Sequence, residues 1–142
     1  MRVKSKKKDP VKEKKELIKQ YERSNDSNKR RISEELKTYS KKIKELSEAV
    51  KGIGKKNNAE KIDKANQIAE ECYNLRARIM WHLNVVDTNY RNYTALIEPD
   101  SLKKALKLRC EAGKYRANAM VDFSKYEAEE KAALKRLSAF AE

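Results

Sequence analysis

Residues 32–53 read ISEELKTYSKKIKELSEAVKGI, and their apolar side chains recur at alternating steps of four and three. The repeating positions are Ile32, Leu36, Tyr39, Ile43, Leu46, Val50 and Ile53. Such a heptad repeat predicts an α-helix whose single apolar seam packs along another helix. Gly52 and Gly54 stand at its end in the manner of a helix C-cap.

The same spacing continues downstream of this segment. Asn58 is placed to start a second helix with Glu60 in its first turn, and Pro99 to end it. Its seam is Ile62, Ala65, Ala69, Cys72, Arg76, Ile79, Leu83, Val86, Tyr90, Tyr93 and Ile97. Ile68, Leu75 and Trp81 widen its apolar surface, which predicts contact with more than one helix.

A third helix is expected to begin at Asp100 or Ser101, since either side chain can cap free amides. Its apolar line is Leu102, Leu106, Cys110, Gly113, Ala117, Met120, Phe123, Leu134, Leu137 and Phe140. A turn near residue 98 would place Cys72 beside residue 124 and Cys110 beside residue 86. On that register the two thiols lie about 20 Å apart along the bundle axis at 1.5 Å per residue, too far for a disulfide. Both are therefore expected to be reduced and packed.

The chain before the first seam has a start signal and a break signal. Asp9 followed by Pro10 favours a helix start, with residues 1–9 as a basic flexible tail. Residues 24–28, SNDSN, prefer caps and turns to helix interiors, which predicts a break there. We therefore expect a short extra helix at the N-terminal end.

These signals together predict an all-α fold. With two prolines and three glycines in 142 residues, few turns are available. We expect an elongated antiparallel three-helix bundle or coiled coil, with helices at about 10–23, 28–53, 58–97 and 100–141 in a single domain of residues 10–142.

Side chains suited to catalysis are few. His82 lies in WHLNVV with no sequence pattern supplying an orienting carboxylate, so we assign it a structural or interfacial role. GIGKK at residues 52–56 lacks P-loop spacing. Adjacent glutamates diverge by about 100° on a helix, and the cysteines lack metal-ligand spacing. We expect no enzyme activity, no cofactor and no metal.

Two polar features on the second helix have alternative explanations. Arg76 interrupts the apolar seam, and it either pairs with Glu35 or Asp122 or extends its guanidinium to the bundle edge. NYRNY at residues 89–93 could stack nucleobases. Because Tyr90 and Tyr93 fall on the heptad seam, we interpret them as core and Arg91 as surface.

The net charge of +13 is concentrated in one part of the chain. Residues 1–58 hold 20 basic and 9 acidic side chains, whereas residues 59–99 hold 5 and 6. With the seam fixed inward, a line of cations lies on the outer face of the first long helix, and more precede it. The candidate phosphate-binding residues are Lys4, Lys6, Lys7, Lys8, Lys29, Arg30, Arg31, Lys37, Lys41, Lys44, Lys51 and Lys55.

This asymmetry favours a non-catalytic structural or accessory subunit that holds nucleic acid through its phosphate backbone, without reading bases, in a larger nucleoprotein assembly. The alternatives are a solvated face on a coiled-coil scaffold that binds a protein or itself, and attraction to an anionic membrane surface. Without a signal peptide or membrane span, we expect an intracellular protein, whether cytoplasmic, nucleoid or virion-associated.

Overall fold

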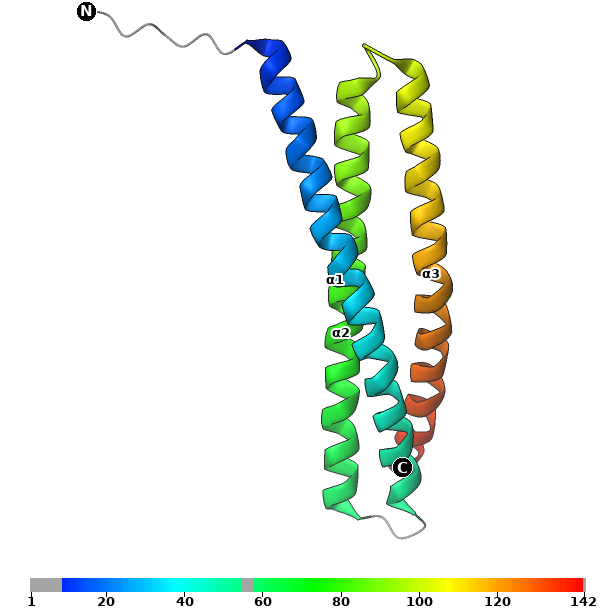
Figure 1. Cartoon of the computed structure of the whole chain (residues 1–142). Helices are drawn as coiled ribbons and strands as arrows, with labels where there is room; N and C mark the ends of the chain where they lie inside the picture. The colour runs from blue at the N-terminus through cyan, green and yellow to red at the C-terminus, as the bar shows by residue number, and fades with distance from the viewer. Residues whose placement is uncertain (1–8, 55–57, 142) are drawn as a thin grey trace, which may run out of the picture.

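The computed structural model describes residues 9–54 and 58–141, and they form three long helices (Figure 1). α1 spans Pro10–Ile53, α2 spans Ala59–Ile97 and α3 spans Leu102–Ser138. One 3-10 turn, η1, follows at Ala139–Ala141. The chain reverses direction between successive helices, so neighbours are antiparallel. The predicted all-α antiparallel three-helix bundle is confirmed.

Each helix begins at the side chain that the sequence indicates. The Asp9 carboxylate accepts from the Val11 amide at 3.0 Å, with Pro10 in the first turn. Asn58 accepts from the amides of Glu60 and Lys61, and Ser101 from that of Lys104. α1 ends at Gly54, whose φ of 70° suits a residue without a Cβ.

The predicted break at residues 24–28 is wrong, because α1 runs unbroken from Pro10 to Ile53 and there is no separate short helix. Two polar side chains of this segment have partners on α2. Ser24 Oγ accepts from the Asn89 side-chain amide at 2.9 Å, and Asn28 Oδ1 lies 2.7 Å from His82 Nδ1. Asn25 is buried.

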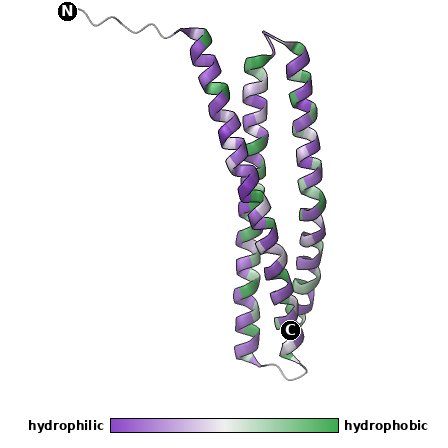
Figure 2. Ribbon diagram, in the orientation of Figure 1, coloured by the Kyte–Doolittle hydropathy of each residue, from purple (hydrophilic) through white to green (hydrophobic). Residues whose placement is uncertain are grey.

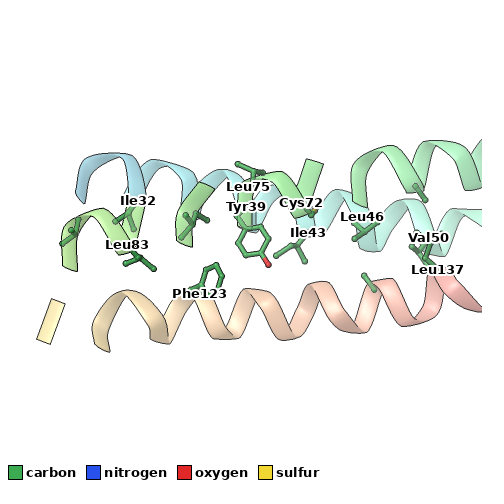
Figure 3. Close-up of a cluster of buried hydrophobic side chains, with 14 of the residues drawn as sticks. Ile32, Tyr39, Ile43, Leu46, Val50, Cys72, Leu75, Leu83, Phe123 and Leu137 are labelled. Carbon is green, nitrogen blue, oxygen red and sulfur yellow. The ribbon is translucent and has the colours of Figure 1, made fainter. Parts of the chain in front are cut away.

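The core follows the first two seams (Figure 3). All seven positions of the first seam are buried or half-buried, and α2 contributes a matching row that includes Cys72, Ile79, Leu83 and Val86. Tyr39 lies between the helices with its ring 6.0 Å from that of Phe123. Burial of these side chains supplies the main stabilisation of the bundle.

The first half of the predicted α3 seam is wrong. Leu102 and Leu106 are 58% and 50% exposed, and Cys110, Gly113 and Ala117 are exposed as well. The inward side of this half is instead made of Ala105, Leu108, Ala112, Tyr115 and Ala119. Three of these five inward residues are alanines, and the two leucines of the predicted seam, Leu102 and Leu106, lie outside.

The N-terminal end of α1 leans away from the other two helices (Figure 1). Its side chains are mostly hydrophilic (Figure 2), and Val11 and Leu17 are exposed. Lys14 nevertheless pairs with Asp100 at the α2–α3 turn at 2.9 Å. Further along, the Tyr21 ring stacks on Tyr93 with centroids 6.4 Å apart.

Candidate nucleic-acid interface

The outer face of α1 carries exposed cations. We define the α1 basic stripe as the six exposed members of the predicted set: Arg30, Arg31, Lys37, Lys41, Lys44 and Lys51. Arg30, Lys37, Lys44 and Lys51 are seven residues apart and therefore share one face, whereas Arg31 lies beside it. From Arg30 to Lys51 the stripe extends about 32 Å at 1.5 Å per residue.

The cations of the stripe are not held in ion pairs with other described residues. Within the described part of the chain, no ion pair or hydrogen bond engages any of its six charged groups. Glu34 and Glu48 are interspersed along the same face and are also exposed. The result is a net positive strip whose charged groups are free to bind an anion.

The C-terminal end of the stripe borders a groove between α1 and α3 of about 310 Å³. Lys44 and Lys51 line it from α1, and Arg136 lines it from the last turn of α3, together with Glu48 and Glu129. Arg136 was absent from the predicted set, because the rotation of α3 relative to α1 is not encoded in either helix alone. It extends the basic surface onto a second helix.

Lys29 does not belong to the stripe. Its ammonium lies between two rings, 4.8 Å from the Tyr90 centroid and 4.6 Å from the Tyr115 centroid, and it donates to Tyr90 Oη at 2.5 Å. This cation–π arrangement keeps the charge inside the bundle. The sequence indicates this inward position, because Lys29 lies three residues before Ile32 and continues the seam towards the N-terminus.

The remaining predicted residues, Lys4, Lys6, Lys7, Lys8 and Lys55, lie outside the described residues. The two tyrosines of the NYRNY segment lie in the core and are not available to stack nucleobases. Tyr90 and Tyr93 are 3% and 5% exposed, as their seam positions predict, and Arg91 is exposed. The exposed aromatic rings of α2 are those of Tyr73 and Trp81. Trp81 therefore does not pack on a neighbouring helix.

Arg76 forms an interhelical ion pair, although with a different acid from those predicted. Its Nε donates to Glu130 Oε1 at 3.0 Å, and Tyr39 Oη donates to the same oxygen at 2.5 Å. Glu35 and Asp122 were the expected partners. Glu35 pairs with Arg78 instead, and Glu130 lies eight residues beyond Asp122 on α3.

This network joins all three helices in the core. Glu130 is 1% exposed, and its second oxygen has no hydrogen-bond partner. Burial and the bond to Glu130 raise the pKa of Tyr39 above its ordinary value. The hydroxyl therefore stays protonated and keeps donating to the carboxylate.

His82 gains a carboxylate neighbour that no sequence pattern indicated. Asn28 Nδ2 donates to Ser24, so Asn28 Oδ1 is the acceptor that faces His82 Nδ1 at 2.7 Å. This bond places the proton of the neutral ring on Nδ1. Nε2 then points at Glu35 Oε2, 3.9 Å away, while Glu35 also pairs with Arg78.

The His82 side chain is 14% exposed, and it lines neither the α1–α3 groove nor a groove between α2 and α3. A general base needs a reacting group within hydrogen-bond reach. The arrangement fits a polar link between α1 and α2.

The two cysteines are free, as predicted. Cys72 is buried, and burial raises the pKa of its thiol to about 12. Cys110 is exposed, so the expectation that it is packed is wrong. Among the described side chains, no three of His, Cys, Asp and Glu gather in a way that could hold a metal ion.

Comparisons with known proteins identify no relative: no family model, curated protein or solved structure matches the chain. Within residues 9–54 and 58–141, no helix combines the length and the apolar character that a membrane crossing requires.

Proposed function

We propose that this chain is a non-catalytic accessory subunit that binds nucleic acid through the phosphate backbone, independently of sequence, within a larger nucleoprotein assembly. The observation that carries the proposal is the α1 basic stripe, a row of exposed and unpaired cations on one rigid helix. The stripe and B-DNA have compatible dimensions. A stripe of about 32 Å is about as long as one turn of B-DNA, so its two ends can reach phosphates on successive turns of the duplex.

The chemistry of the stripe supports backbone contact without base reading. Four of its six members are lysines, whose ammonium groups act as point charges on flexible stems. Bidentate recognition of bases relies on Arg, Asn and Gln held towards a groove. Binding by the stripe should therefore depend on salt and be tolerant of sequence.

A matched pair of double variants tests the proposal. Lys37→Gln/Lys41→Gln removes two exposed cations, four residues apart, from the stripe, and Lys103→Gln/Lys107→Gln removes two with the same spacing from α3 that likewise have no ion-pair partner among the described residues. Affinity for a fluorescent duplex of arbitrary sequence is measured at low salt. We expect a loss of roughly tenfold or more for the α1 pair and a much smaller loss for the α3 pair. Equal losses would show that only net charge matters, and the proposal would fail.

A further inference from the structure

The outer side of α3 is apolar where no helix covers it. We define the α3 outer stripe as Leu102, Leu106, Gly113 and Ala117, which recur at steps of four, seven and four and so share one face. All four are exposed, the two leucines by half or more. The opposite side of the same turns packs in the core through Ala105 and Ala112. A helix that is apolar on two sides has room for a further neighbour: α1 and α2 pack on the inward side of α3, and no described helix covers the outer stripe.

A groove of about 590 Å³ runs beside this stripe between α2 and α3. Small residues form much of its surface, including Ala95 from α2 and Ala112, Gly113 and Ala117 from α3. No described residue of α1 lines it. A Cβ built on Gly113 would meet no atom within 4 Å, so the space above it is open. Small side chains let a further helix approach closely, because the distance between packed helices depends on the side chains at the contact.

The charge around the groove indicates which kind of partner the groove would bind. Residues 102–117 hold six basic side chains and one acid, Glu111. Arg91 adds an exposed cation on the α2 side, and within the described chain it has no ion-pair partner. Arg109 and Arg116 also line the groove, paired with Glu98 and Asp87. The groove is therefore apolar along its length and positive at its edges.

This combination disfavours two other occupants. A second copy of the chain using the same face would bring one basic α3 against another, and like charges across an interface are costly. A nucleic acid could neutralise the cations but would leave Leu102 and Leu106 uncovered. A helix with an apolar stripe flanked by carboxylates satisfies both features.

We propose that the α2–α3 groove, with the α3 outer stripe, docks an acidic amphipathic helix of a partner protein. The leucines and the small residues would receive its apolar side, and Arg91 together with the lysines of α3 would face its carboxylates. The site lies on different residues from the α1 basic stripe, so the two surfaces can be occupied together.

The test uses a synthetic helical peptide of about 18 residues with leucines at heptad positions and glutamates on both flanks. Binding to the full chain is followed by fluorescence anisotropy and by amide shifts of the labelled protein. We expect saturable binding with shifts centred on residues 91–117. A peptide with lysine in place of every glutamate should not bind.

Three variants locate the site. Leu102→Gln/Leu106→Gln removes the leucines, and Gly113→Met fills the groove where the structure has free space, so each should weaken peptide binding at least tenfold. Val11→Gln is the matched control, because Val11 is 62% exposed and lies on α1, which contributes no described residue to the groove or to the α3 outer stripe. Circular dichroism shows whether each variant is folded.

Four results would overturn this inference: no binding of the acidic peptide, shifts outside the groove, equal binding by Gly113→Met, or self-association of the chain that Leu102→Gln/Leu106→Gln abolishes. Lys37→Gln/Lys41→Gln should bind the peptide normally. That variant separates failure of this proposal from failure of the nucleic-acid proposal.

Discussion

At the scale of single residues, Glu130 determines how the three helices meet. One of its oxygens accepts from both Arg76 of α2 and Tyr39 of α1. The carboxylate is fully enclosed, whereas the Arg76 side chain is 30% exposed. The two partners of this ion pair are therefore unequal.

Because Glu130 is more buried than Arg76, substitutions at the two residues should lower the stability by different amounts. Arg76→Met leaves a buried carboxylate without its cation and should lower the free energy of unfolding by about 3 kcal/mol. Glu130→Gln should cost about 1 kcal/mol, since the guanidinium left behind can reach water. Urea unfolding measures both values. If Glu130→Gln proves the more damaging, Glu130 is not confined as described.

The protein should unfold at high pH, because several buried side chains would then lose a proton. Burial raises the pKa of Tyr115 to about 12 from 10.0 and that of Cys72 to about 12 from 9.0, and it raises the pKa of Tyr39 as well. Each folded pKa lies above its unfolded value, so the stabilisation is complete below pH 9 and is lost as pH rises from 9 towards 12.

We expect tyrosinate absorbance to rise in a late phase that coincides with the loss of helical circular dichroism. Tyr39→Phe should remove one tyrosine from that phase. Complete tyrosine titration with the helices intact would contradict the burial of these rings.

The two thiols should differ sharply in reactivity. Cys110 is exposed, whereas Cys72 is enclosed and its thiol has a raised pKa, which keeps it from forming thiolate. An aromatic disulfide reagent at pH 8 should label one thiol rapidly in the native chain and two in denaturant. Cys110→Ser should abolish the rapid phase. Two rapid phases in the native chain would show that the core opens around Cys72.

At the scale of helices, three glycines occupy unlike positions. Gly52 and Gly113 lie inside helices, where an added Cβ meets no atom within 4 Å, so alanine at each should raise stability by roughly 0.5–1 kcal/mol. Gly54 ends α1 with φ of 70°, a conformation that strains other residues, so Gly54→Ala should destabilise. Thermal unfolding compares the three. Stabilisation by Gly54→Ala would mean that the C-cap is wrongly described.

Helix existence and helix starts were predictable because they depend on local chemistry. The heptad spacing and the capping side chains at Asp9, Asn58 and Ser101 act within a few residues. The prediction of a break at residues 24–28 failed because the side chains of Ser24 and Asn28 have partners on α2, and such long-range contacts override local preference. The predicted seam of the first half of α3 failed for a related reason. This half is apolar on two sides, and the spacing of its residues does not determine which side faces inward.

At the scale of the whole molecule, the bundle separates two surfaces. The α1 basic stripe lies on one helix, and the apolar groove lies between the other two. Exposure of most stripe residues followed from the seam, because fixing the inward positions of a helix also fixes its outward ones. The inward placement of Lys29 and the position of Arg136 beside Lys44 were not predictable, because both depend on how the helices are rotated relative to one another.

The measurement that tests the central proposal most directly is the salt dependence of duplex binding. Log affinity is plotted against log salt for the intact chain and for Lys37→Gln/Lys41→Gln/Lys44→Gln/Lys51→Gln. We predict a linear fall with a slope of about −4 or steeper for the intact chain, and a slope shallower by about 3.6 for the variant, since each phosphate contact contributes about 0.9. Absence of binding at low salt, or a slope that the four substitutions leave unchanged, would contradict a phosphate-binding role for the α1 basic stripe.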